Sequence, residues 1–403
     1  MKKTVLLIGT LDTKGDEYEY VRDLIALKGF EVVLIDGGVV DAPTVTPTFS
    51  AEEVAELGGS SLTALRDQQD RGLAMKVMSD GIAILVDRLC MERDVVGVMG
   101  MGGSGGTALI THTMRQLPIG MPKLVVSTVA SGDVHPYVGT KDITMMYSVV
   151  DVAGLNKISR RILGNAAGAL IGMIEQEIPE VEDKPIIAAS MFGVTTTCVE
   201  NLKKHIEENG YELLVFHATG SGGQAMESLI SDGFIKAVAD VTTTELCDEL
   251  VGGVLSAGPH RLEAAAREGI PQVVSCGALD MVNFGAMNTV PSKFANRTLY
   301  EHNANVTLMR TTPEECAELG KILSEKLNET TGPTTLFLPL KGVSAIDGEG
   351  QLFDSPEATE ALFASIRKHL NQNVVELIEL DRHINDPEFA AAMASHLLSK
   401  LNE

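Results

Sequence analysis

The sequence predicts two α/β domains, each a doubly wound, mainly parallel sheet of the Rossmann-like type. Short apolar runs alternate with runs of helical periodicity along the first half of the chain, and the alternation restarts after a charged connector. Strands that alternate with helices in this way pair in parallel and carry helices on both faces of the sheet. The chain has 403 residues, too many for one ordinary core, and 44% of them are hydrophobic, as in well-buried globular domains.

The positions of apolar runs and of glycines predict the helices and strands of the first domain. An apolar run at 4–8 predicts the first strand, and residues 16–27 carry apolar side chains at helical spacing before Gly29 stops the helix. The other elements expected are strands at 31–35, 95–99, 123–127 and 143–149, and helices near 107–117 and 156–177. Residues 39–71 are rich in turn residues, and a lid, a contact surface and a plain insertion all fit them.

A charged connector that ends in proline, residues 180–185, predicts the domain boundary, with one domain at 1–183 and the other at 184–403. After the connector, residues 184–190 mirror 3–9, and residues 271–275 mirror 122–126. The identity is thin, so it predicts a common topology rather than a duplication. The later elements expected are strands at 306–309, 334–338 and 374–380, and helices at 313–327, 356–370 and 387–401.

Composition and charge exclude several classes of protein. A net charge of −23 disfavours nucleic acid as a partner, because its phosphates need a basic surface. The apolar runs are too short to span a bilayer, and the first residues carry no signal-peptide pattern, so no membrane partner is expected. The five cysteines are scattered without a C-x-x-C pair, which predicts reduced thiols, a cytoplasmic location and no zinc framework.

A glycine-rich turn at 100–107 is the strongest functional signal. It lies between a strand-like run and a helix-like run, where unpaired backbone N–H groups and the helix dipole favour an anion. The spacing G-x-G-x-x-G is present, but the turn follows the third strand rather than the first, and no Walker A lysine follows it. The alternative is a tight turn that only lets the helix pack closely on the sheet.

Other polar residues follow the predicted strands and are expected at the same edge of the sheet as the glycine turn. Hydroxyl groups and a lysine suit phosphate oxygens, and aspartates suit ribose hydroxyls or Mg²⁺, although each aspartate also fits a helix cap or a turn. The sequence therefore predicts a site for ATP with Mg²⁺, without a metal centre held by the protein alone. The predicted nucleotide-binding residues are Thr10, Asp12, Thr13, Lys14, Asp36, Gly102, Gly103, Ser104, Gly105, Gly106, Thr107, Thr128 and Ser131.

A second polar set in the later half predicts an acid–base site in a cleft between the domains. The candidate catalytic residues are His260, Arg261, Asp280 and His383. At the start of a helix-like run, His260 would stay neutral and act as a base, and Arg261 would hold a carboxylate or phosphate. The alternative for Arg261 is a solvent-facing turn, paired with Glu245 or Glu263. Cys276 fits either a nucleophile or a small buried side chain.

Several motifs in this order resemble one family over nearly the whole chain: Gly9 to Glu17, Gly100 to Thr107, Gly258 to Arg261, and Lys341 to Ser344. This is the uncharacterised bacterial and fungal family related to the ATP-binding N-terminal region of the tomato mosaic virus resistance protein. The resemblance implies two α/β domains, nucleotide binding in the first, and self-association as a homodimer or a higher homo-oligomer. It implies no reaction. An enzyme acting on a small carboxylate metabolite and a non-catalytic, nucleotide-responsive regulatory or interaction module therefore both stay open.

Overall fold

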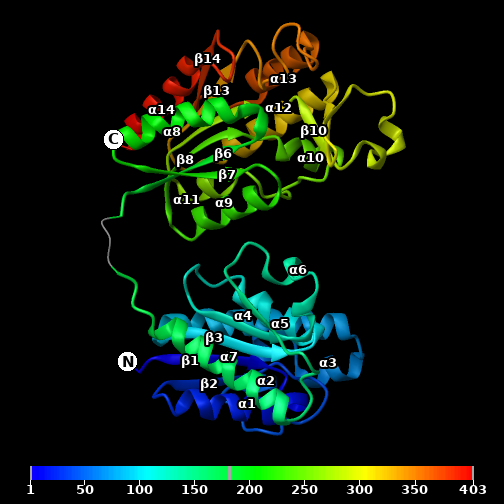
Figure 1. Cartoon of the computed structure of the whole chain (residues 1–403), viewed down its shortest axis with the longest axis vertical. Helices are drawn as coiled ribbons and strands as arrows, with labels where there is room; N and C mark the ends of the chain where they lie inside the picture. The colour runs from blue at the N-terminus through cyan, green and yellow to red at the C-terminus, as the bar shows by residue number, and fades with distance from the viewer. Residues whose placement is uncertain (1, 180–182, 402–403) are drawn as a thin grey trace. The chain divides into compact units, whose positions relative to one another are not determined.

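The computed structural model describes residues 2–179 and 183–401, so residues 180–182 of the predicted connector lie outside the described residues. The chain divides into two compact units, Met1–Glu180 and Val181–Glu403 (Figure 1). Each unit is an α/β domain built on a parallel sheet, which confirms the predicted fold class. No helix of the described residues has the length and apolar character needed to cross a bilayer.

The N-terminal domain holds a five-stranded sheet in the order β2-β1-β3-β4-β5, and every neighbouring pair is parallel. Its strands are β1 (Thr4–Gly9), β2 (Glu31–Asp36), β3 (Val95–Gly102), β4 (Lys123–Ser127) and β5 (Thr144–Tyr147). Its helices are α1 (Leu11–Ala26), α2 (Ala51–Leu57), α3 (Leu62–Gln68), α4 (Arg71–Glu92), α5 (Ser104–Met114), α6 (His135–Val138) and α7 (Lys157–Glu175).

Helices cover both faces of this sheet. In β1, Val5 and Leu7 point to the face packed by α1 and α7, whereas Leu6 and Ile8 point to the face packed by α2, α4 and α5. Strand residues alternate between the two faces, so a strand buried on both sides is apolar throughout. This is why 4–8 reads as one continuous apolar run.

The strand order contains a topological switch point between β1 and β3. The chain leaves β1 toward β2 on one side of it and later enters β3 on the other side. In open parallel sheets of this kind, ligands bind beyond the carboxyl ends of the two strands at the switch point. The loop after β1 and the glycine turn after β3 both lie at this edge.

Several boundaries differ from those predicted. Strand β3 continues through Gly100 to Gly102, because these residues pair with Val125 to Ser127 of β4, and α5 therefore starts at Ser104 rather than Thr107. Helix α1 starts at Leu11 rather than Asp16, with a break in helical backbone at Lys14 (φ −137°, ψ 22°). The turn-rich segment 39–71 contains α2 and α3.

The C-terminal domain holds a six-stranded parallel sheet in the order β14-β13-β9-β8-β6-β7. Its strands are β6 (Ile186–Met191), β7 (Glu212–His217), β8 (Ile235–Thr242), β9 (Gln272–Gly277), β13 (Thr334–Pro339) and β14 (Val375–Leu380). Its helices are α8 (Thr196–Glu208), α9 (Ser221–Ser231), α10 (Glu245–Val251), α11 (Ala264–Glu268), α12 (Pro313–Asn328), α13 (Pro356–His369) and α14 (Pro387–Leu401).

The first five strands of this parallel sheet repeat the order of the N-terminal sheet, as the mirrored sequence predicts: β7-β6-β8-β9-β13 corresponds to β2-β1-β3-β4-β5. A small antiparallel sheet in the order β10-β12-β11 is an addition that the sequence did not predict. Its strands are β10 (Met281–Phe284), β11 (Leu299–Asn303) and β12 (Val306–Arg310).

Candidate functional site

The glycine turn begins α5 with its first amides open. The N-cap residue Gly103 supplies no side-chain cap, and Ser104 is exposed. Within the described residues, the amides of Ser104, Gly105 and Gly106 donate to no protein acceptor. Uncapped amides at a helix start carry partial positive charge and bind anions. The turn can therefore seat a phosphate or carboxylate group.

The glycines of this turn fall into two groups. A Cβ at Gly100 would lie 2.6 Å from Cδ1 of Ile110, so the packing of α5 on β3 requires glycine there. At Gly103 and Gly106 the nearest atoms would lie at 3.7 and 3.8 Å, which is ordinary contact. Glycine in a helix costs about 0.5–1 kcal/mol relative to alanine. The packing of the protein does not require glycine at positions 103 and 106. The two glycines thus leave open space above the first turn of α5.

An arginine that the sequence analysis missed lies beside this turn. A Cβ at Gly105 would lie 3.1 Å from Nη2 of Arg71, the first residue of α4. Arg71 is exposed, and in the described part of the chain its guanidinium has neither a hydrogen bond nor an ion pair. The only sequence signal for it is a basic residue at the start of a long helix, where a cation has the unfavourable sign.

The loop after β1 brings two hydroxyls and a carboxylate to the same edge. Thr10 and Thr13 hydrogen-bond through their hydroxyls at 3.0 Å. Oδ2 of Asp12 accepts from the Val40 amide at 2.9 Å, whereas Oδ1 is buried with no hydrogen-bond partner. A buried carboxylate oxygen without a partner is costly, so Oδ1 of Asp12 can accept from a ligand or coordinate a cation.

Lys14 is engaged with the loop that follows β5. Its Nζ donates to the Val152 carbonyl at 2.5 Å, and nearby the Glu17 carboxylate accepts from the Gly154 amide at 2.5 Å. The Val152 carbonyl takes one of the three N–H groups of the Lys14 ammonium. The two bonds hold the loop against the start of α1.

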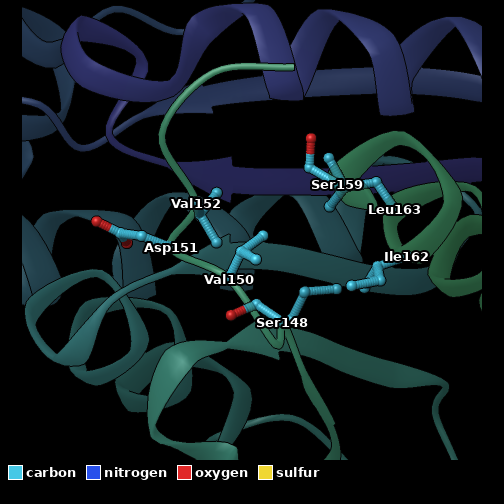
Figure 2. Close-up of a pocket in the computed structure, with 8 residues that line it drawn as sticks. Ser148, Val150, Asp151, Val152, Ser159, Ile162 and Leu163 are labelled. Atoms are coloured by element: carbon cyan, nitrogen blue, oxygen red, sulfur yellow. The ribbon is translucent and has the colours of Figure 1, made fainter. Parts of the chain in front are cut away.

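A small cavity lies at this loop, between β4 and α7 (Figure 2). It is lined by Val126, Ser148, Val150, Asp151, Val152, Ser159, Ile162 and Leu163. Its volume of about 10 Å³ holds at most one water molecule, and Oγ of Ser148 is buried there without a hydrogen-bond partner. The cavity suits a bridging water and is too small for any part of a nucleotide.

Asp36 and Thr107, two of the predicted nucleotide-binding residues, hold the backbone around the site in place. Oδ1 of Asp36 accepts from the amides of Leu11 (3.0 Å) and Gly38 (2.8 Å), which fixes the loop after β1. Burial raises the pKa of Asp36 to about 6, against these two hydrogen bonds, which lower it. Thr107 is fully buried, and its hydroxyl lies 2.6 Å from the Ser127 hydroxyl, so it fastens α5 to β4 instead of facing a ligand.

Tyr18 links the two strands of the switch point, a role that the sequence analysis missed. Its hydroxyl donates to the Ile8 carbonyl at 2.6 Å and accepts from the Met101 amide at 2.8 Å. A Cβ at Gly9 would lie 2.0 Å from the Tyr18 hydroxyl, so Gly9 leaves room for this bridge. The remaining candidates lie on the segment after β4: Thr128 is half-buried beside Gly103, and Ser131 is exposed.

In the C-terminal domain Arg261 is buried, which corrects both the expected anion anchor and the expected solvent-facing turn, although the pairing with Glu245 that the second interpretation included is present. Only 1% of it is exposed, so it neither faces solvent nor lies free to hold a substrate. Its guanidinium donates to Asp240 at 2.5 and 2.7 Å, and its Nε donates to Glu245 at 2.6 Å. Glu227 also lies 3.2 Å from Nη1. Each of the three guanidinium nitrogens therefore donates to a carboxylate.

His260 does not join Arg261 in a site. Its side chain is 86% exposed, and Nδ1 lies 2.9 Å from the Glu263 carboxylate. Helix α11, which His260 was expected to begin, has only the five residues Ala264–Glu268 and does not include His260 or Arg261. The predicted pair of a base and an anion anchor is therefore split between solvent and the interior.

Asp280 and His383 are brought together through the segment after β13. The Ser344 hydroxyl donates to Oδ2 of Asp280 at 2.7 Å, and Nε2 of His383 lies 2.9 Å from the Ser344 carbonyl. Burial raises the pKa of Asp280, and Oδ1 of this carboxyl is buried without a hydrogen-bond partner. Arg310 lowers the pKa of Asp280 and donates to Asp347 at 2.9 Å.

The remaining chemistry of this domain is enclosed. Cys276 is fully buried, and burial raises the pKa of its thiol, so it is a small core side chain rather than an activated nucleophile. All five cysteines are free. No group of three or more His, Cys, Asp or Glu side chains in the described ranges is arranged to hold a metal ion.

The chain belongs to an uncharacterised protein family, UPF0261. The model of the family's N-terminal domain matches residues 3–179, and that of its C-terminal domain matches residues 184–401. A UPF0261 protein of Clostridium tetani is 54% identical over the full length of both chains, and one of Rhizobium meliloti is 48% identical over 98% of each. These matches confirm the predicted resemblance.

A plant protein is related as well. The ToMV resistance protein Tm-1(GCR237) of Solanum lycopersicum is 40% identical over 98% of this chain, which spans 55% of the tomato protein. Among solved structures, a UDP-GlcNAc 2-epimerase of Methanocaldococcus jannaschii covers 100% of this chain and 93% of its own, with 10% identity and a TM-score of 0.24. Similarity at this level supports no inference about fold or function.

Proposed function

We propose that this member of the UPF0261 family binds a nucleotide, ATP with Mg²⁺, at the carboxyl ends of β1 and β3 in its N-terminal domain. The observation that carries the proposal is the open first turn of α5, whose amides of Ser104, Gly105 and Gly106 donate to no protein acceptor of the described residues. The turn lies at the switch point of a parallel sheet, the edge at which such sheets bind ligands.

Each neighbour has a role suited to a nucleotide. The amides of the first turn of α5 would hold phosphate oxygens, and the hydroxyls of Thr10, Thr13 and Thr128 would add neutral donors. Oδ1 of Asp12 is a buried carboxylate oxygen without a hydrogen-bond partner, so it fits Mg²⁺. Mg²⁺ usually takes one or two carboxylates together with substrate phosphates, and it would neutralise phosphate charge here.

The protein environment agrees with this proposal in two further respects. A chain of net charge −23 holds an anion only through local dipoles and a few cations. The start of α5 supplies the dipole, and Arg71 beside it supplies a cation. The motif resemblance implies nucleotide binding in the same domain. We also propose that the protein acts in the cytoplasm, in keeping with its five free cysteines, and as a homodimer or higher homo-oligomer.

Between an enzyme and a nucleotide-responsive module, the C-terminal domain favours the module. The enzyme hypothesis needs an anion anchor beside a base, and Arg261 is committed to Asp240 and Glu245 inside the core. Asp280 and His383 both contact Ser344 and are compatible with acid–base chemistry, but the Asp280 carboxyl is buried. A reaction on a small carboxylate metabolite therefore stays the second candidate.

Calorimetric titration of the full chain with ATP and Mg²⁺ tests the proposal. Wild type should bind saturably, and Gly105→Val should weaken binding at least tenfold, because the new side chain fills the space above the first turn of α5. Gly168→Val is the matched control, since Gly168 is an exposed helical glycine with nothing within 4 Å of a Cβ. Equal binding by Gly105→Val and wild type would displace the turn from the site. Wild type that binds no nucleotide would end the proposal.

A further inference from the structure

We infer that two copies of this chain associate through the outer face of α7, with the two helices antiparallel about a two-fold axis beside Gly168. The inference rests on the proposed self-association and names its surface. The outer face is the exposed side of α7 and of the short segment after it: Ile158, Arg161, Gly164, Gly168, Gly172, Glu175 and Ile178.

Helix α7 covers the sheet with one side and exposes the other. The buried side includes Leu163, Ala166 and Leu170, which belong to the core shared with α1 on that face of the sheet. Residues three and four positions apart lie on the same side of a helix. The outer face follows this spacing along the whole of α7, opposite the buried side, so it forms one continuous strip at the surface.

The outer face is symmetric about Gly168, with its charges reversed. A glycine lies four residues away on each side, and an isoleucine lies ten residues away on each side, 50% exposed at Ile158 and 84% exposed at Ile178. Seven residues away lie Arg161 on one side and Glu175 on the other. In an antiparallel pair with its two-fold axis at Gly168, each residue lies opposite its counterpart in the second copy. Glycine then meets glycine, isoleucine meets isoleucine, and arginine meets glutamate.

The two charges of the outer face are unfavourable in a lone α7. Arg161 lies near the positive start of the helix dipole, and Glu175 is the last helical residue, at the negative end. Within the described residues, neither side chain forms an ion pair or a hydrogen bond. Both lie about 10 Å from Gly168 along the helix, at 1.5 Å per residue. An antiparallel second copy therefore brings each charge to its opposite, whereas a parallel one would place arginine against arginine.

The glycines of the outer face are not required by the packing of the domain. A Cβ at Gly168 or Gly172 would meet no atom within 4 Å, and at Gly164 the nearest atom would be the Tyr20 hydroxyl at 3.7 Å, an ordinary contact. Glycine weakens a helix relative to alanine, and it allows another backbone to approach closely. The glycines thus let two helices meet, and the charges and isoleucines on either side identify the second helix. A partner of another sequence would need no such symmetry, so the partner is a second copy of this chain.

The test measures the mass of the full chain in solution by sedimentation over a range of concentrations. Arg161→Glu and Glu175→Arg each place like charges across the axis, so each should weaken association by at least about tenfold. Mixed in equal amounts, the two variants should associate with each other, because every facing pair is then of opposite charge. Arg88→Glu, at an exposed position of α4, makes the same change in net charge and should associate like wild type. Thermal melting checks that each variant is folded.

Gly168→Val tests the close approach of the two helices without any change in charge. Two valines would face each other at the axis and hold the backbones apart, so association should weaken. The nucleotide affinity of this variant should stay that of wild type, because no residue of the proposed nucleotide site lies on α7. The two proposals are thereby measured separately.

Wild type that stays monomeric at every concentration would end both this inference and the proposed self-association, and it would leave the nucleotide site standing. Wild type that associates while Arg161→Glu associates equally well would overturn the α7 surface alone. Folded single variants that remain monomeric when mixed would also overturn it, because their loss of association would not come from the facing of Arg161 and Glu175. Association of Gly168→Val at wild-type strength would remove the axis from Gly168 and contradict the inference.

Discussion

At the scale of residues, the chain uses buried carboxylates for two purposes. In the C-terminal domain Glu245 occupies a helix start and joins Asp240 on Arg261. In the N-terminal domain Asp36 holds two backbone amides at the end of β2. A buried charge is tolerated only where hydrogen bonds and opposite charges replace water. Each of these groups therefore makes a specific prediction about stability.

Arg261→Gln should destabilise the C-terminal domain strongly. Removing one partner of a buried ion pair leaves an uncompensated charge and costs about 3–5 kcal/mol. Here the change leaves Asp240 and Glu245 without the guanidinium that both contact. Urea unfolding followed by circular dichroism measures the loss. Arg267→Gln is the control, because Arg267 is 61% exposed and its contacts with Glu268 and Ser231 lie at the surface. A loss at Arg261 as small as the loss at Arg267 would contradict the burial described here.

Asp36 should make the N-terminal domain less stable as the pH rises from about 4 to about 6. Burial raises its pKa from 3.8 to about 6, so in this window the folded state binds more protons than the unfolded state. Stability falls with pH wherever the folded state binds more protons. Asp36→Asn keeps an oxygen acceptor for Leu11 and Gly38, and it should flatten this dependence. Hydrogen exchange of β1 and β2 amides across the window reports it. Asp87→Asn, at an exposed position of α4, should keep the wild-type slope.

The residue scale also separates what the sequence could predict from what it could not. Thr10, Asp12 and the glycine turn could be assigned to one edge, because the ends of parallel strands meet there. Arg71 could not, since its place depends on how α4 crosses the sheet after the 39–71 segment. Arg261 could be paired with Glu245 as one alternative, but its burial depends on Asp240 and Glu227, which come from a strand and a helix elsewhere.

At the scale of elements, hydrophobic periodicity and the positions of glycine and proline located most helices and strands. Tertiary contacts decided at which residues these elements begin and end. Strand β3 runs on to Gly102 although glycine is a poor strand residue, because β4 supplies a parallel partner for it. The antiparallel sheet of β10, β11 and β12 was missed as a sheet. The strand predicted at 306–309 is β12, whereas β10 and β11 were not predicted, because their pairing with β12 defines them.

Lys14→Met should loosen the loop that follows β5. The Lys14 ammonium donates to the Val152 carbonyl, and methionine has a similar length but no donor. Hydrogen exchange of residues 149–155 should become several-fold faster. The gain stays moderate, because Glu17 still accepts from the Gly154 amide. Lys157→Met, at an exposed position of α7, is the control and should leave the loop unchanged. Unchanged exchange in Lys14→Met would show that the ammonium does not hold the loop.

At the scale of the whole molecule, each unit has cores of its own. The N-terminal cores lie on the two faces of its sheet, and the C-terminal cores draw only on residues after the connector. The two family matches, 3–179 and 184–401, fall on the same two units. The mirrored sequence led to the expectation of a shared strand order, because one topology imposes similar patterns on both halves. It could not reveal that the Gly-Ser-Gly-Gly turn at 220–223 donates its amides to Glu245, whereas the first amides of the turn at 103–106 have no protein acceptor among the described residues.

A fragment of residues 1–180 should therefore fold alone and keep the nucleotide affinity of the full chain within about threefold. Every residue of the proposed site, from Thr10 to Ser131, lies in this unit, and its sheet is buried on both faces by its own helices. A domain of this size buries enough apolar surface to be stable without a partner. Circular dichroism checks the fold, and calorimetry with ATP and Mg²⁺ checks the site. The fragment carrying Gly105→Val serves as the negative control. A folded fragment that has lost binding, while the full chain retains it, would mean that residues after 180 complete the site.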